Sequence, residues 1–197
     1  MERIKRLQDH EVSIDEPACH EELARVLRKL VLDLHQPGQD LVLLCIGTDR
    51  CTGDALGPLI GTQLQQRGLE GVHVYGTLAE PVHATNLQEA LAKIELEHQN
   101  ALVIAIDACL GKQENVGKIL VGQGPLKPGS GVNKNLPAVG DLYIIGIVNV
   151  GGFMDHFVLQ NTRLYLINRL AQAIADGLME CLSGYRSCLP QVAIATE

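Results

Sequence analysis

Two aspartates, each following a short apolar run, are the residues whose types and spacing best fit catalytic chemistry. Asp54 lies in a glycine-rich loop after the run Leu41 to Ile46, and Asp107 ends the run that starts at Ala101. Such runs are typical of strands buried on both faces of a parallel sheet. Ligands and catalytic groups gather where these strands end. We therefore predict that Asp54 and Asp107 share one site.

The chemistry of such a pair follows from its charge. Two carboxylates in one site titrate as a coupled pair, with one ionised and one protonated at intermediate pH. The ionised member can activate water as a general base while the other donates a proton. The alternative for Asp107 is a helix cap or a turn residue. A charge at the end of an apolar strand is costly unless it is needed, and two strands that each deliver an Asp favour the functional interpretation.

A third polar loop, residues 76–85, carries Glu80 and His83 after a short predicted strand at 72–75. A polar connecting loop is the plainer interpretation, and for His83 alone it is preferred. The functional interpretation gains weight because this loop also leaves the carboxyl end of a strand. His156, after the last predicted strand, is a further candidate, although a helix-start histidine is the commoner case.

The segment 124–137 is long and nearly without regular structure, and long loops in compact domains are usually functional or disordered. Its glycine and serine groups offer backbone N–H donors to an oxygen ligand, and its lysines can lower the pKa of a carboxylate. The GxxxxGK[ST] pattern of a Walker A loop is absent. The substrate-binding candidates are Glu80, His83, Lys127, Ser130, Gly131, Asn133 and Lys134.

Helical and strand patterns alternate along the chain, which predicts a three-layer α/β/α domain with a mostly parallel sheet. Helices are expected at about 16–34, from Leu56 to Gly68, at 86–98 and, as one long helix, at 157–182. Further strands are expected at 118–121 and 141–150. The short connection between them permits an antiparallel strand. We expect one domain over residues 1–197, with loosely ordered residues 1–13 and peripheral arms at 1–14 and 184–197.

Composition excludes several classes of function. The net charge is −7 and no basic patch stands out, which argues against a nucleic-acid partner. No apolar run approaches a membrane span and no signal peptide is apparent. The six cysteines show no CxxC spacing, so we expect reduced thiols in a cytoplasmic protein, with Cys51 the most notable of them.

Three motifs in order carry a resemblance: Gly53-Asp54-Ala55-Leu56-Gly57-Pro58, Ile104-Ala105-Ile106-Asp107-Ala108 and Pro128-Gly129-Ser130-Gly131-Val132-Asn133-Lys134. They resemble the germination (spore) protease and, more closely, its small sporulation relatives of the YyaC family. The hydrogenase maturation endopeptidases are similar more distantly. The likeness covers about residues 41–170. Lys127 stands where the germination protease has a histidine, one glycine of that loop is missing, and no zymogen segment is evident.

The resemblance implies a phosphorylase/hydrolase-like sheet of five strands in the order 2-1-3-5-4, with strand 4 antiparallel. It places Asp54 and Asp107 at the positions of the two functional aspartates. It implies a sporulation-associated endopeptidase that acts without a cofactor on a protein or peptide, with a spore protein among the candidate substrates and a homo-oligomer among the candidate assemblies. Two alternatives stay open. One is a non-catalytic sporulation factor that binds a peptide or protein partner, and the other is a metal-dependent endopeptidase with Asp54, Asp107 and either Glu80 or His83 as ligands of a divalent metal.

Overall fold

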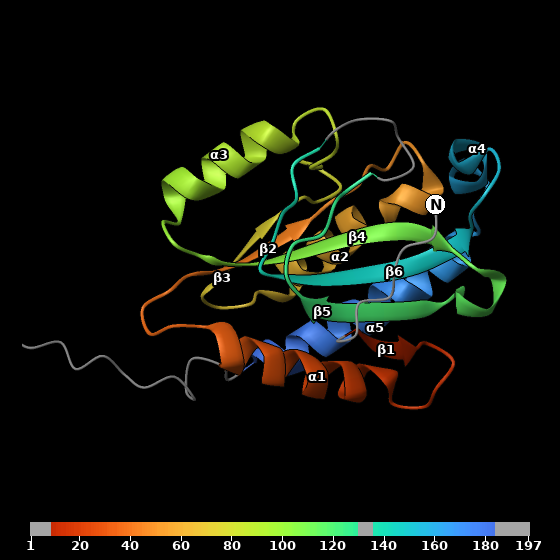
Figure 1. Ribbon diagram of the computed structural model, residues 1–197. Helices are drawn as coiled ribbons and strands as arrows, with labels where there is room; N and C mark the ends of the chain where they lie inside the picture. The colour runs from red at the N-terminus through yellow and green to blue at the C-terminus, as the bar shows by residue number, and fades with distance from the viewer. Residues whose placement is uncertain (1–8, 130–135, 184–197) are drawn as a thin grey trace, which may run out of the picture.

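A six-stranded mixed sheet forms the centre of the computed structural model, which describes residues 9–129 and 136–183 (Figure 1). Its strands lie in the order β1-β5-β6-β4-β2-β3. Their bounds are β1 His10–Ser13, β2 Leu41–Cys45, β3 Val72–Tyr75, β4 Leu102–Gly111, β5 Lys118–Gln123 and β6 Leu142–Val150.

The strand directions match the prediction. β3, β2, β4 and β6 run parallel to one another, and β5 pairs antiparallel with β6. The prediction did not include β1, so its strands 1 to 5 correspond to β2 to β6. In that numbering the observed order is the predicted 2-1-3-5-4, and the fourth strand, β5, is antiparallel as predicted. The α/β class is confirmed, but the sheet has six strands instead of five.

The extra strand, β1, corrects the expectation that residues 1–13 are loosely ordered. His10–Ser13 pairs antiparallel with β5, and Lys118 Nζ lies 2.6 Å from Glu11 Oε1 across this pair. Val12 and Ile14 alternate with polar residues, and both are buried in the core. That alternation is the signal of a half-buried strand, and the segment was too short to stand out. Residues 1–8 lie outside the described part of the chain.

The helices follow the apolar spacing of the sequence, with one correction. They are α1 Cys19–Leu34, α2 Leu56–Arg67, α3 Leu87–Glu97, α4 Asp155–Gln160 and α5 Leu164–Leu182, with short 3₁₀ turns η1 Thr52–Ala55 and η2 Gln113–Asn115. The single helix expected at 157–182 is broken: α4 ends at Gln160, α5 begins at Leu164, and the Thr162 hydroxyl at the break donates to the Val158 carbonyl. None of the helices in residues 9–129 and 136–183 is long and apolar enough to cross a membrane.

Two apolar clusters cover the two faces of the sheet (Figure 1). Helices α1, α2 and α5 pack on one face, and α3 packs on the other together with the segment pinned by the Leu126–Val139 bridge. Side chains alternate along β4, so that Ile104 and Ile106 belong to the first cluster and Ala105 to the second. The predicted three-layer arrangement is confirmed.

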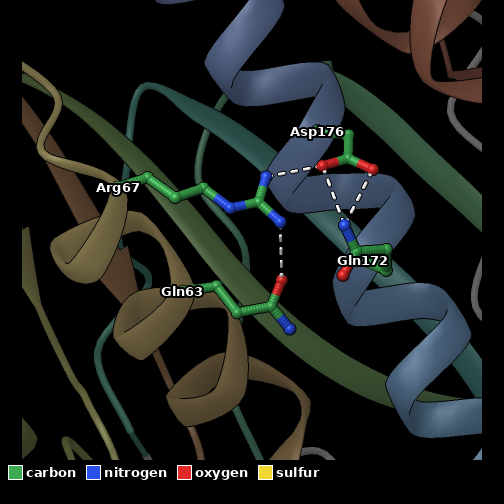
Figure 2. A network of polar contacts seen from close by, with 4 residues as sticks. All are labelled: Gln63, Arg67, Gln172 and Asp176. Carbon is green, nitrogen blue, oxygen red and sulfur yellow. Dashed lines mark hydrogen bonds and ion pairs between the residues drawn. The ribbon is translucent and has the colours of Figure 1, made fainter.

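Helices α2 and α5 are joined at the surface by a polar network (Figure 2). Arg67 Nη1 lies 2.5 Å from Asp176 Oδ1, and Gln172 Nε2 donates to both carboxylate oxygens at 2.9 Å. Burial alone would raise the pKa of Asp176, but the hydrogen bonds from Gln172 and Arg67 and the nearby Arg67 charge outweigh it. The pKa of Asp176 is therefore lowered.

This network predicts a pH-dependent contribution to stability. An aspartate with a lowered pKa stabilises the fold above its unfolded pKa of about 3.9, and the contribution is lost as the pH falls through the folded pKa. Arg67→Met should lower the free energy of unfolding at pH 7 by less than about 1 kcal/mol, because the pair is part-exposed. The difference from the parent should shrink at pH 3, as measured by urea unfolding at both pH values.

Arg25→Met is the matched control. Arg25 forms a looser pair with Glu22 at 3.7 Å, and both side chains are at least half exposed. We expect Arg25→Met to leave the free energy of unfolding unchanged at both pH values. The proposed role of the network would be contradicted if both variants lost the same free energy of unfolding. It would also be contradicted if the loss in Arg67→Met were as large at pH 3 as at pH 7.

Candidate functional site

The loop that carries Asp54 is fixed by main-chain hydrogen bonds to two neighbouring segments. The Ile46 N–H donates to the Ile106 carbonyl of β4 at 2.7 Å, and the Gly47 N–H donates to the Val82 carbonyl at 2.8 Å. The Thr48 N–H closes the loop on the Asp54 carbonyl at 3.0 Å. The carboxyl end of β2, the middle of β4 and the 76–85 loop therefore adjoin one another.

Close backbone contacts hold the loop against α2. A Cβ placed on Gly57 would lie 2.2 Å from the Ile46 carbonyl oxygen, so a larger residue there requires the helix to move. Gly47 has a φ of +149°, and a Cβ there would lie 2.0 Å from the Asp54 carbonyl oxygen. Glycine at these two positions lets the start of α2 and the main chain of Asp54 pack directly on the end of β2.

The Asp54 carboxyl group is half-buried, and burial raises its pKa. A hydrogen bond from the Cys51 thiol and the charge of His156 each act in the opposite direction and offset only part of this effect. The Cys51 side chain is buried, and burial followed by the Asp54 charge raises the pKa of this thiol. The thiol therefore stays protonated and acts as a hydrogen-bond donor to Asp54.

His156, whose charge acts on Asp54, lies in the short helix α4, which the sequence did not separate from α5. α4 packs on η1 so closely that a Cβ on Gly53 would lie 2.9 Å from the Leu159 carbonyl oxygen. His156 is exposed, and its Nε2 lies 3.2 Å from the Gln160 amide nitrogen. The pair of poor helix formers before Arg163, Asn161 and Thr162, was the available signal for the break.

Asp107 lies within β4 and not at its end, because the strand continues to Gly111 through a bulge between Cys109 and Leu110. It pairs with Ile145 of β6 and is half-buried. Its Oδ1 accepts from the N–H of Ala108 at 2.8 Å. β4 packs against η1, the turn that carries Asp54. The convergence of the two carboxyl groups stays a prediction.

The 76–85 loop lies beside the Asp54 loop through the parallel bridge between Ile46 and Val82. His83 follows Val82 directly, and its Nδ1 lies 2.9 Å from the Thr85 hydroxyl. Glu80 is exposed, and its N–H donates to the Thr77 hydroxyl at 3.1 Å. The structure thus brings the backbone of this loop to Asp54, while the substrate-binding roles of Glu80 and His83 stay predictions.

The second predicted binding segment is described only in part. Lys127 is exposed beside the Leu126–Val139 bridge, on the face of the sheet that α3 covers. Ser130, Gly131, Asn133 and Lys134 lie outside the described residues. The metal alternative at Asp54 and Asp107 also stays a prediction. In residues 9–129 and 136–183, the three potential metal ligands that lie close together are Asp40, His73 and His98, and none of them belongs to this site.

Comparison with known proteins gives a family and a fold neighbour. A family model described as "Protein of unknown function (DUF1256)" matches residues 11–177. The uncharacterized protein YyaC of Bacillus subtilis (strain 168) is 50% identical over 177 residues, which cover 90% of this chain and 83% of that protein. The crystal structure of the nickel–iron hydrogenase maturation protease HycI from Thermococcus kodakarensis KOD1 aligns with a TM-score of 0.48 and 17% identity, covering 78% of this chain and 98% of that one. The predicted resemblance to the YyaC family is confirmed, and the chain belongs to the DUF1256 family.

Proposed function

We propose that this protein is an endopeptidase that hydrolyses peptide bonds with Asp54 and Asp107. The observation that carries the proposal is the state of Asp54. Its half-buried carboxyl group has a raised pKa, it accepts a hydrogen bond from the Cys51 thiol, and the loop that carries it packs closely on the end of β2. Perturbed carboxyl groups at the carboxyl edge of a parallel sheet are candidates for acid–base catalysis.

The raised pKa of Asp54 divides the roles of the two carboxyl groups. Asp54 is the member that holds the shared proton and donates it to the oxygen of the scissile carbonyl. Asp107 is the general base that takes a proton from the attacking water. When the tetrahedral intermediate collapses, Asp107 gives the proton it took from water to the leaving nitrogen, a hydroxyl of the intermediate gives its proton back to Asp54, and the products are a carboxylic acid and an amine. The Cys51 thiol orients the Asp54 carboxyl group and does not react.

Apolar side chains beside the site fit a peptide substrate. Phe153, Met154 and Phe157 are 84%, 58% and 56% exposed, and they surround the start of α4 next to His156. Gly152, Met154, Asp155, His156 and Phe157 line a surface hollow there. Exposed apolar groups of this kind mark interaction surfaces. Because the motifs resemble the germination protease, proteins of the spore are the first substrates to test.

The mutational test uses Asp54→Asn and Asp107→Asn, which keep side-chain size and remove the titrating oxygen. Each change should lower kcat/KM by about 100-fold or more, the scale of general acid–base catalysis. Cleavage of spore-protein peptides, followed by mass spectrometry, measures this loss. Asp49→Asn is the control, because Asp49 is exposed in the same loop, and it should keep parental turnover.

Two results would count against the mechanism. Parental turnover in Asp54→Asn would remove this carboxyl group from the chemistry. A parent protein that binds peptides through the α4 surface without cleaving them would instead support the alternative, a sporulation factor that binds a partner. Phe157→Ser, which removes an exposed apolar group, should weaken binding in either case.

A stability measurement separates a catalytic Asp54 from a structural one. A raised folded pKa means that the native state binds the proton more tightly, so Asp54 favours the fold below its unfolded pKa of about 3.9 and loses this benefit as the pH rises through the folded pKa. Asp54→Asn should therefore be as stable as the parent at pH 3 and more stable at pH 7 in urea unfolding. A structural cap would behave in the opposite way and cost about 1–3 kcal/mol at pH 7.

A further inference from the structure

Three potential metal ligands meet at the amino edge of the sheet, away from the site of Asp54. Asp40 directly precedes β2, His73 is the second residue of β3, and His98 directly follows α3. Each offers one ligand atom, and these atoms all lie within 4.8 Å of one another. The rings of His73 and His98 lie 3.9 Å apart between centroids. Strand pairing holds the group in place, because Val42 of β2 is opposite His73, and the Asp40 carbonyl accepts from the Leu102 N–H at 2.8 Å.

A hydrogen-bond chain sets the tautomer of His98. The Tyr75 hydroxyl donates to Glu97 Oε2 at 2.6 Å, and the same oxygen lies 2.9 Å from His98 Nε2. A phenol has one hydrogen, which is given to Glu97, so His98 Nε2 must donate to the Tyr75 oxygen.

The other nitrogen of His98 then faces a carboxylate. Nδ1 lies 3.0 Å from Asp40 Oδ2, and the His98 side chain is only 9% exposed while that of Asp40 is 45% exposed. With Nε2 protonated, Nδ1 of a neutral ring presents a lone pair to the carboxylate oxygen, which also presents lone pairs. Two acceptors at this distance require a cation, either a proton on Nδ1 or a metal ion. A second imidazole, His73, lies against the same ring and adds a further lone-pair donor.

We propose that Asp40, His73 and His98 bind one divalent transition-metal ion, with zinc as the first candidate. Two imidazoles and one carboxylate are a ligand set that zinc accepts, whereas calcium and magnesium prefer oxygen ligands alone. The chain from His98 through Tyr75 to Glu97 fixes the ring of a ligand through its second nitrogen, as outer-shell partners do at metal sites. A surface hollow lined by His98, Asn100 and Asp141 adjoins one of the three ligands.

Such an ion would join three segments that are distant in sequence: the start of β2, the start of β3 and the end of α3. Its effect would therefore be on the stability of this edge of the sheet, because a ligand that binds only the folded state stabilises it. The site does not depend on the proposed peptidase activity, which uses the opposite edge.

The test is zinc chloride binding to the full chain after removal of metals with a chelator. Isothermal titration should show one equivalent of zinc bound, with a rise in Tm of several degrees at saturation. His73→Asn should weaken binding by at least about 10-fold and abolish the rise in Tm. Asp40→Asn should do the same. His10→Asn is the matched control, because His10 is an exposed histidine in another strand, and it should bind as the parent does.

Zinc could instead bind near Cys51 and His156, and two measurements exclude this. His156→Asn should leave the affinity unchanged, and the cobalt-loaded protein should lack the charge-transfer band that a thiolate ligand produces. No zinc binding by the parent, or binding unaffected by His73→Asn and Asp40→Asn, would overturn the proposal. The cation between Asp40 and His98 would then be a proton.

Discussion

The contact between the start of α2 and the end of β2 is the constraint on which the candidate site depends. The Ile46 carbonyl occupies the space where a side chain of residue 57 would begin, and the Asp54 carbonyl does the same at Gly47. Because two backbone segments meet without side chains between them, the intervening loop has little room to adjust. The half-burial of Asp54, and with it the raised pKa, follows from this packing and not from a charged neighbour.

The fold was largely predictable because its strands are buried on both faces. Continuous apolar runs such as Leu41 to Cys45 mark strands without ambiguity, and the connections between them allow few topologies. β1 was harder to predict, since four residues with a single fully buried side chain carry too weak a pattern. The break between α4 and α5 was missed because the apolar spacing continues across it, while the interruption depends on Thr162 and on its partner Asn149, which lies in a different element.

The sequence predicted the part of the candidate site that lies where parallel strands end. Asp54 and the 76–85 loop meet the same edge because parallel strands all end there. Cys51 and His156 were noted in the sequence, but their grouping around Asp54 was not predicted, because a turn and a short helix position them and the directions of both depend on tertiary packing. His73 and His98 went unrecognised as a pair for a similar reason. One is in a strand and the other follows a helix; the register between β2 and β3 brings His73 to Asp40, and the end of α3 brings His98 there.

The strand β1 has a consequence for the order in which the chain folds. Glu11 and Lys118, which meet across β1 and β5, are separated by 107 positions in sequence. Closing such a long loop has a high entropic cost, so β1 pairs with β5 only after most of the sheet has formed. During that interval the β5 edge, with Ile119 and Val121, presents unpaired main-chain groups to other chains. Although β1 is synthesised first, it pairs late, and its pairing covers an edge that is otherwise open to strands of other chains.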